Sequence, residues 1–543
     1  MVGVRKYIRF IDGLRKFAQA RIDPEEAIAL ARTQLRKRIV AREENFLCLA
    51  KRGIFENDRS PYGPLLAVRH IRFDDLKSWV EREGLEATLE TLQTEGVYFT
   101  VDEFKGKTPV RRHGLCLVCD EKMFDNPYLS LAYEVRSGAT RSAGTRIRID
   151  FDYLHQRSLY DALLLDVHGC LTAPIANWFP VFPGAPGINS SLRFAHIGNP
   201  AQRWFSQVSE DQVRVNWEKR WGTKTIFAIH RLCGTPLAEP EYAGLNDARR
   251  IVRWAGQALA DHPRCVIYTF AASAVRVVNA AAEENISLKG AKFLLTGEPL
   301  TPHKKAEIES GGATAIPVYG ISEAGVVAAG CDRSHAQSDH CHLYKDTMAV
   351  ITHRQAVPHF DISLNAFLFT TLLYESPKLL LNVGMGDYGE LHPCACDCQF
   401  GGLGYNTGIS SIRSYEKLTG EGVTFVDTDF LHIIEKELPE LFGGRSTDYQ
   451  LMEEEDKAGF TRLQLIISPR VGKVNEKAVL DKFLILLRSG EASPESWAQS
   501  GVEMWRQSGA VQIRRSDPIS TASGKVLPFH LQKAISPAVW ETR

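Results

Sequence analysis

Short apolar runs alternate with segments of mixed polarity through the central part of the chain. The runs at 264–270, 293–295 and 316–319 have the length of buried strands. The segment 271–284, between the first two runs, is expected to be a helix. Strand and helix in alternation predict a right-handed parallel α/β unit.

The connection between the last two runs carries boundary signals of its own. Thr301 suits the N-cap of a helix, Pro302 its first position, and the glycine pair 311–312 its end. Parallel strands joined by helices place their following loops at one edge of a sheet, which is where ligands bind in α/β proteins. The loops 297–298 and 320–325 are therefore expected to face one crevice.

Both ends of the chain contain further helical and strand patterns. Residues 24–53 have an apolar face at helical spacing after a start signal of cap, proline and glutamate, which we interpret as one long packing helix. In the C-terminal part, 430–438 is expected to be a helix, 449–452 and 460–467 a hairpin, and 511–514 a strand. These segments predict a separate small α+β unit.

Length and composition limit what the protein can be. The chain has 543 residues, too many for one hydrophobic core, and 44% hydrophobic with 24% charged residues is typical of globular proteins. Lys+Arg and Asp+Glu both number 65, so bulk charge favours neither a nucleic-acid nor a membrane partner. The sequence has no apolar run long enough to span a bilayer and no apolar signal segment at its start. These absences predict a cytoplasmic location.

Five of the eleven cysteines fall within residues 331–398. Clustered cysteines in a cytoplasmic chain bind metal more often than they form disulfides. Cys331, the cluster 340–342 and the run 394–398 make a tetrahedral zinc set if they meet in the fold, and buried thiols without metal are the alternative. The CxxC at 116–119 has no second CxxC and is interpreted as structural, with a metal or redox role as the alternative.

A Ser/Thr/Gly-rich turn lies within residues 133–150. Backbone amides, hydroxyls and the conformational freedom of glycine suit a polyphosphate. The turn is not a Walker A loop, because no Lys-Ser/Thr pair follows its glycines; Arg141 and Arg146 are the positive charges nearby. A plain flexible turn is the alternative. The candidate phosphate-binding residues are Ser137, Gly138, Thr140, Arg141, Ser142 and Thr145.

These stretches, taken in order, resemble the motifs of adenylate-forming enzymes, the phenylacetate–CoA ligase-like branch in particular. The phosphate loop is followed by GEP at 297–299, YGISEAG at 319–325, a Gly-Asp pair at 386–387 and PISTASGK at 518–525. Each motif alone is weak, but the family's order is kept over most of the chain. The phosphate loop departs from the family pattern, since the usual lysine is missing.

The resemblance implies roles for individual residues. Tyr319 would stack on adenine, Ser322 would contact phosphate, Glu323 would help to hold Mg²⁺, and Asp387 would bind the ribose hydroxyls. Lys525 would bridge the substrate carboxylate and the α-phosphate. A flat ring suits a purine, and a carboxylate beside a triphosphate needs a bridging cation. The catalytic set is Lys525, Glu323 and Ser322, and the further nucleotide-binding residues are Gly297, Glu298, Pro299, Tyr319, Gly320, Asp387 and Arg413.

The resemblance also implies an α/β fold in two parts. A large N-terminal adenylation domain, 1–412, would contain parallel and mixed sheets flanked by helices. A hinge at 413–422 would join it to a small mobile α+β domain, 423–543, which carries Lys525. Arg413 matches the arginine of the family's hinge motif, whereas Tyr415 departs from that motif.

Some relatives in this branch carry a cysteine after the YGISEAG position, a later histidine and a late CxC. Cys331 and His342 match the first two, and two of Cys394, Cys396 and Cys398 match the last. Such a site would be structural, because four protein ligands leave no open position on zinc.

The implied activity is ATP-dependent activation of a carboxylic acid, with release of pyrophosphate and transfer of the acyl group to a thiol. CoA is the expected acceptor; a phosphopantetheine carrier protein or an amine remains open. A different class also remains open. The altered phosphate loop and hinge are compatible with a degenerate nucleotide-binding protein that has no ligase activity.

Overall fold

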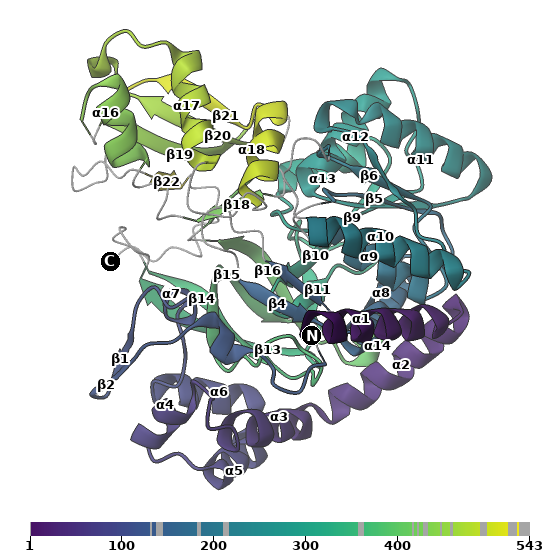
Figure 1. Cartoon of the computed structure of the whole chain (residues 1–543), viewed down its shortest axis with the longest axis vertical. Coiled ribbons are helices and arrows are strands. Elements are labelled where there is room, and N and C mark those ends of the chain that lie inside the picture. Colours follow the sequence, from purple (N-terminus) through teal and green to yellow (C-terminus); the bar gives the residue numbers. More distant parts are fainter. Residues whose placement is uncertain are drawn as a thin grey trace.

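The computed structural model describes residues 2–130, 133–136, 145–181, 186–209, 217–356, 363–414, 417–420, 423–426, 433–445, 448–456, 460–488, 497–519 and 529–531. A mixed sheet of twelve strands forms its centre, in the order β13-β14-β15-β16-β12-β11-β10-β9-β8-β5-β6-β7 (Figure 1). These strands are β5 (Ile175–Trp178), β6 (Arg203–Ser206), β7 (Pro240–Tyr242), β8 (Cys265–Thr269), β9 (Ala291–Leu295), β10 (Thr314–Ile321), β11 (Gly325–Ala329), β12 (Cys341–Leu343), β13 (Met348–Ala356), β14 (Ser363–Thr371), β15 (Val383–Pro393) and β16 (Thr407–Ser414).

The sheet changes character at β10. From β7 to β10 every neighbouring pair is parallel, whereas β10 and the strands beyond it pair antiparallel. Figure 1 shows the parallel strands between two groups of helices. The helices around this half are α1 (Val2–Gln19), α8 (Phe151–Val167), α9 (Pro186–His196), α10 (Trp217–Leu232), α11 (Arg249–Asp261), α12 (Ala271–Glu283) and α13 (Pro302–Ser310).

The expected alternation in the centre is present as β8, α12, β9, α13 and β10. Strand β9 pairs in parallel with both β8 and β10. The side chain of Thr301 caps α13 by accepting from the Lys304 amide at 3.2 Å, and Pro302 takes the first helical position. The sequence prediction of a parallel α/β unit is therefore confirmed.

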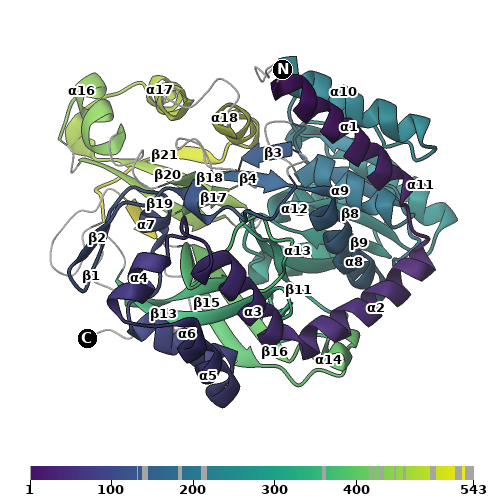
Figure 2. The same ribbon diagram turned by 60° about the horizontal axis from the view of Figure 1, so that its bottom comes forward.

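The N-terminal helical segment differs from its prediction. The expected helix over 24–53 is broken at Ala41, whose φ of −91° and ψ of 13° end α2. The guanidinium of Arg42, which follows the break, donates to the Lys345 carbonyl and pairs with Glu86, so tertiary contacts favour the kink. The pieces on this side of the molecule are α2 (Pro24–Val40), α3 (Arg42–Ala50), the π-helix η1 (Lys51–Phe55), α4 (Gly63–Val68), α5 (Phe73–Glu83), α6 (Leu85–Thr94) and α7 (Val101–Phe104) (Figure 2).

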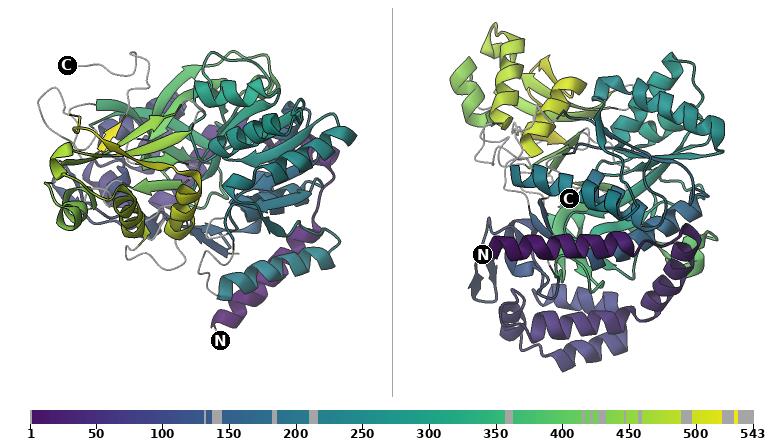
Figure 3. Two further views of the ribbon diagram at one scale, coloured as in Figure 1. Left: turned by 90° about the horizontal axis from the view of Figure 1, so that it is seen from above. Right: turned by 45° about the vertical axis from the view of Figure 1, so that its right-hand side comes forward.

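A smaller sheet, β21-β20-β19-β22, forms the C-terminal part, drawn in yellow-green in Figure 3. The predicted hairpin is present, with Tyr449 opposite Ile467. The elements here are β17 (Lys417–Gly420), β18 (Val423–Val426), the π-helix η5 (Ile433–Glu437), α16 (Leu438–Phe442), β19 (Tyr449–Glu455), β20 (Thr461–Ile467), η7 (Pro469–Val471), α17 (Glu476–Arg488), α18 (Trp497–Ser508), β21 (Val511–Arg515) and β22 (Phe529–Leu531).

Two small hairpins and three short helices complete the described elements. They are β1 (Val110–Arg112) with β2 (Leu115–Leu117), β3 (Tyr133–Arg136) with β4 (Arg146–Ile149), η2 (Glu121–Phe124), η4 (Leu245–Asp247) and α14 (Gln399–Leu403). No helix among the described residues is both long and apolar enough to cross a membrane.

Two buried histidines make stability depend on pH. His196 stacks on Phe17 with ring centroids 4.3 Å apart, and burial together with His155 lowers the pKa of His196 to about 4. Burial also lowers the pKa of His230 to about 4. Both imidazoles are therefore neutral in the fold at pH values where the unfolded chain takes up protons.

The free energy of unfolding is expected to fall as the pH drops from about 6.5 towards 4. At pH values below the ordinary histidine pKa, each of these histidines binds a proton in the unfolded chain but not in the folded chain. This difference lowers the free energy of unfolding by about 2 kcal/mol per site at pH 5. Urea unfolding at pH 7.5 and pH 5 measures the loss. His230→Gln should reduce that loss by about 2 kcal/mol; an unchanged difference between the two pH values would show that His230 does not contribute.

Candidate functional site

Residues 322–324 form the tight connection between β10 and β11. The sequence predicted a loop at 320–325; in the structure β10 continues to Ile321, which pairs with Gly325 across a hairpin turn. The hydroxyl of Tyr153, in α8, donates to the Ala324 carbonyl at 3.1 Å. Gly325 has φ of +84°, and a Cβ at this position would collide with the Tyr153 hydroxyl, so only glycine fits. Helix α8 thus holds the turn in place.

Two of the predicted residues in this turn differ in solvent exposure. Ser322 is exposed, whereas Glu323 is 7% exposed. No basic side chain of the described part of the chain forms an ion pair with Glu323. Mg²⁺ is typically bound by one or two carboxylates together with substrate phosphates, so Glu323 is a candidate ligand for this ion.

Tyr319 and Asp387, predicted from separate motifs, lie together. The Tyr319 hydroxyl donates to Asp387 Oδ2 at 2.9 Å, and the two residues are 68 positions apart in the chain. Burial and the Asp387 carboxylate raise the pKa of Tyr319, so the phenol is protonated at neutral pH and can donate. The Gly-Asp motif itself lies inside β15 and is not a loop.

Arg413 lies beside this pair on the neighbouring strand. In the register of β15 and β16, Tyr388 faces Arg413 and Asp387 faces Ser414. The Arg413 guanidinium pairs with Asp339 at 3.2 Å, and Asp339 also accepts the backbone amide of Ser411 at 2.9 Å. The sequence analysis missed Asp339, a buried carboxylate that no motif includes.

The loop at 297–299 faces α12 and the C-terminal part. Gly297 has φ of +75°, and the Glu298 carboxylate accepts the Ala272 amide at the start of α12. The fully buried Lys304 ammonium pairs with Glu298 at 3.3 Å and donates to Thr461 of β20 at 3.0 Å. Glu298 therefore has a structural role that its sequence position did not reveal. Pro299 follows in the same loop.

The structure describes the two strands that flank the predicted phosphate loop, but not residues 137–144 of the loop itself. β3 and β4 pair with Arg136 opposite Arg146, which brings the two ends of the loop together, and Thr145 is buried. Arg146 pairs with Glu134 at 2.9 Å and with Asp125, so its charge is already compensated. The predicted residues outside the described part are Ser137, Gly138, Thr140, Arg141 and Ser142 of the loop, Tyr415 of the hinge, and Lys525.

Cysteine and histidine side chains from three places lie close together. These places are the segment after β11, strand β12 and the segment that leads into α14. Cys331 Sγ lies 3.9 Å from Cys396 Sγ, and Cys398 Sγ lies 3.5 Å from His342 Nε2. Around one tetrahedral zinc, sulfur–sulfur and sulfur–nitrogen separations of about 3.8 and 3.6 Å follow from the usual bond lengths. These donors therefore fit a zinc ion.

The surroundings of these donors also fit a metal. His342 Nδ1 lies 2.7 Å from the Tyr405 carbonyl, which directs Nε2 at the thiols, and the Gly401 amide donates to Cys398 at 3.4 Å. A hydrogen bond from Cys331, aided by His342, lowers the pKa of Cys398 and favours its thiolate.

The structure brings three further histidines to the cluster. His335 Nε2 lies 3.2 Å from Cys331 Sγ, so it is an alternative ligand. His340 Nε2 lies 3.6 Å from Cys394 Sγ and its Nδ1 lies 3.2 Å from His392 Nε2. The Cys-x3-His spacing of 331–335 was the signal available for His335. Cys394 Sγ is therefore closer to His340 Nε2 than to His342 Nε2, from which it lies 4.0 Å away.

The fold is similar to that of solved structures, although no family model and no curated protein sequence matches this chain. A 2-hydroxyisobutyryl-CoA ligase, solved with 2-HIB-AMP and CoA in the thioesterification state, aligns with a TM-score of 0.52 and 14% identity over 91% of this chain and 90% of that one. The chain thus has the fold of that protein over nearly its whole length. An o-succinylbenzoate CoA synthetase from Bacillus subtilis aligns with a TM-score of 0.41 at 12% identity, over 74% of this chain and 68% of that one. An amide bond synthetase from Marinactinospora thermotolerans aligns with a TM-score of 0.38 at 10% identity, over 77% and 70%.

Proposed function

We propose that this chain is an adenylate-forming acid–thiol ligase of the phenylacetate–CoA ligase-like type. The observation that carries the proposal is the hydrogen bond between Tyr319 and Asp387, beside the turn that holds Glu323. Residues assigned to adenine and Mg²⁺ from one stretch of sequence and to ribose from another thus come from adjoining elements. The similarity in fold to a CoA ligase supports the same reading.

In the first step, a carboxylate oxygen of the acid attacks the α-phosphorus of ATP. A C–O–P linkage forms, the bond to the β-phosphate oxygen breaks, and pyrophosphate leaves. Tyr319 would position adenine and Asp387 the ribose, while Ser322 and the 137–145 loop would bind phosphate oxygens. A Mg²⁺ ion at Glu323 would supply charge neutralisation. Positioning and charge neutralisation account for most catalysis at phosphorus.

Lys525 would act in this step from the C-terminal part, with its ammonium between the carboxylate and the α-phosphate. In the second step a thiol attacks the acyl carbon, the thioester forms, and AMP leaves with the electrons of the C–O bond. We propose domains at 1–412 and 423–543 with the hinge at 413–422, so that rotation of the small domain separates the two steps. CoA is the proposed acceptor, with a carrier-protein thiol or an amine as alternatives.

One observation favours a second candidate function. The phosphate loop lacks the lysine of the family pattern, and Arg146 is engaged with two carboxylates. A protein that binds the nucleotide without turning it over would have this feature.

A structural zinc completes the proposal. Cys331, Cys396 and His342 would hold it together with either His335, whose donor atom lies within 4.8 Å of the other three, or Cys398, whose Sγ lies 3.5 Å from His342 Nε2. Four protein ligands leave no open position, so zinc would tie the end of β11 to α14 and supply no chemistry to the reaction.

Asp387→Asn is expected to raise the KM for ATP about 10- to 100-fold, because a charged acceptor for the ribose hydroxyls becomes a neutral amide. Acid-dependent exchange of labelled pyrophosphate into ATP measures this. Asp261→Asn, an exposed change at the end of α11, is the matched control. A KM for ATP within twofold of wild type in the Asp387 variant would contradict the role given to this residue.

A further inference from the structure

The cysteine–histidine cluster contains more metal donors than one zinc ion can use. Its donor atoms form two groups, and within each group all atoms lie within 4.8 Å of one another. With Cys398, which lies beside His342, the donor residues are Cys331, His335, His340, His342, Cys394, Cys396 and Cys398. A tetrahedral zinc ion takes four ligands, so a single ion leaves several of these side chains unused.

His342 belongs to both groups but can serve only one ion. Its Nδ1 lies 2.7 Å from the Tyr405 carbonyl, which can only accept, so Nδ1 carries the proton and Nε2 is the single donor to a metal. The first group has a replacement, because the Cys398 thiol shares hydrogen bonds with Cys331 and Cys396. The resulting Cys3His set, a usual set for structural zinc, is Cys331, His335, Cys396 and Cys398.

The second group has the spacing of a metal site of its own. Cys394 Sγ lies 3.6 Å from His340 Nε2 and 4.0 Å from His342 Nε2. The usual zinc bond lengths give a sulfur–nitrogen separation of about 3.6 Å. All three side chains are buried, since the exposed fractions of His340, His342 and Cys394 are 4%, 0% and 8%. One ion would satisfy the three donors at once.

Neighbouring groups direct the His340 ring at Cys394. His340 Nδ1 lies 3.2 Å from His392 Nε2, which leaves the His340 Nε2 atom for the thiol side. The His335 ring stacks on the His340 ring with centroids 3.6 Å apart. Gly408 makes room for the pair, because a Cβ there would collide with the rings of both His392 and His340. The orientation that a metal needs is therefore built into the fold.

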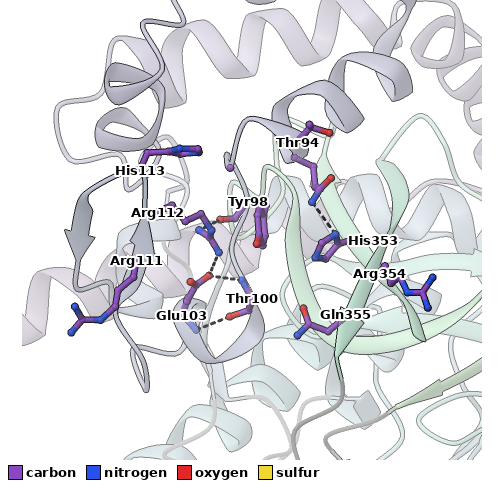
Figure 4. Close-up of a pocket in the computed structure, with 12 residues that line it drawn as sticks. Thr94, Tyr98, Thr100, Glu103, Arg111, Arg112, His113, His353, Arg354 and Gln355 are labelled. Atoms are coloured by element: carbon purple, nitrogen blue, oxygen red, sulfur yellow. Dashed lines mark hydrogen bonds and ion pairs between the residues drawn. The ribbon is translucent and has the colours of Figure 1, made fainter. Parts of the chain in front are cut away.

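Histidines elsewhere in the described part of the chain do not gather in this way. Groups of three or more close metal donors occur there in this cluster alone. The pocket between the β1–β2 hairpin and β13 also contains two histidines, but Figure 4 shows His113 and His353 on opposite sides of Tyr98. His353 is bonded to Gln93 at 2.8 Å instead.

We propose that the cluster binds two zinc ions, and that the second ion is held by His340, His342 and Cys394. The Cys398 thiolate bridges the two ions, because its sulfur has lone pairs for both, and it gives the second ion a fourth ligand. Each cysteine releases its thiol proton on binding. The second ion joins β12 to the end of β15, the strand that carries Asp387. The inference extends the zinc site of the proposed function and does not depend on ligase activity.

The two ions differ in how easily they are removed. Cys331, His335 and Cys396 are half-buried, and the first two line a cavity of about 490 Å³. A chelator is therefore expected to withdraw the first ion and to leave the second, whose three donors His340, His342 and Cys394 are buried.

The test is metal analysis of the full chain after saturation with zinc and removal of the excess by gel filtration. Wild type should contain about two equivalents, and Cys331→Ser and Cys394→Ser should each retain about one, since each loses a ligand of a different ion. His340→Gln leaves every thiol in place and should match Cys394→Ser. His262→Ala, which changes an exposed histidine elsewhere, is the control and should retain both ions.

A single equivalent in zinc-saturated wild type would overturn the proposal, as would an undiminished zinc content in both Cys394→Ser and His340→Gln. A wild type without zinc would overturn the first site as well. Pyrophosphate formation is measured on the same preparations. Two bound ions without pyrophosphate from any acid would contradict the ligase function and leave the two-ion site standing.

Cobalt-substituted protein, produced in cobalt-supplemented medium, tests the bridge without any measurement of activity. Two cobalt(II) ions that share a thiolate couple magnetically. The paramagnetic resonance signal per cobalt should therefore be weaker in wild type than in Cys394→Ser, which holds one ion. Equal signals per cobalt in the two proteins would overturn the bridging role of Cys398.

Discussion

Replacing Lys525 with alanine is expected to reduce acyl-adenylate formation by at least about 100-fold, the usual effect of removing one fixed group that stabilises transition-state charge. Negative charge builds on the α-phosphate oxygens during attack, and a neutral methyl group cannot offset it. Lys525 lies outside the described residues, so the expectation rests on the tail motif and on the order of motifs along the chain. Single-turnover formation of acyl adenylate measures the loss.

The two half-reactions separate this role from a general defect. The Lys525 variant should still convert a supplied acyl adenylate to the thioester, because that step involves attack at carbon and no pentavalent phosphorus. Lys473→Ala, an exposed lysine of the same C-terminal part, is the matched control and should keep both steps. Adenylation at the wild-type rate by the Lys525 variant would contradict the assignment of the C-terminal motif to the active site.

Cys331→Ser is expected to eliminate about one equivalent of bound zinc and to lower the free energy of unfolding by about 4 kcal/mol. That value applies when free zinc exceeds the Kd a thousandfold, since the folded state alone binds the ion. Cys331 joins the end of β11 to Cys396, which lies just before α14, so its loss opens the cluster at a cross-chain contact. Metal analysis and chemical unfolding of the same preparation measure both effects.

Cys116→Ser is the control, because this exposed thiol lies outside the cluster. It should retain zinc and stability. A chelator should bring wild type to the stability of the Cys331 variant and leave that variant unchanged. Zinc-free wild-type protein with full stability would instead support the alternative of buried thiols without metal.

The central α/β unit could be predicted because its signals are local. Thr301 and Pro302 mark the start of α13, and apolar runs bounded by glycines mark β9 and β10. The prediction of one long helix over 24–53 was wrong because the break depends on contacts that are distant in the chain. Its pattern continues through Ala41, but Arg42 meets Glu86 and Lys345, two residues that the local sequence cannot reveal.

Part of the candidate site could likewise be predicted from the sequence, and part could not. The order of motifs suggested that Tyr319 and Asp387 share a site, and their side chains are bonded. Asp339 was missed because it stands in no motif and its partner Arg413 is 74 residues away in the chain. His335 was missed although it lies four residues after its partner Cys331. The buried contact of Lys304 with Thr461 joins parts of the chain 157 residues apart, beyond any local pattern.

The most direct test of the central claim is the formation of pyrophosphate and acyl adenylate from ATP and a panel of carboxylic acids, with the thiol omitted. The proposed function predicts one pyrophosphate for each acyl adenylate, dependent on the acid and on Mg²⁺, and conversion to thioester with AMP when CoA is added. Tight ATP binding without pyrophosphate from any acid of the panel would contradict it and would favour a nucleotide-binding protein without ligase activity.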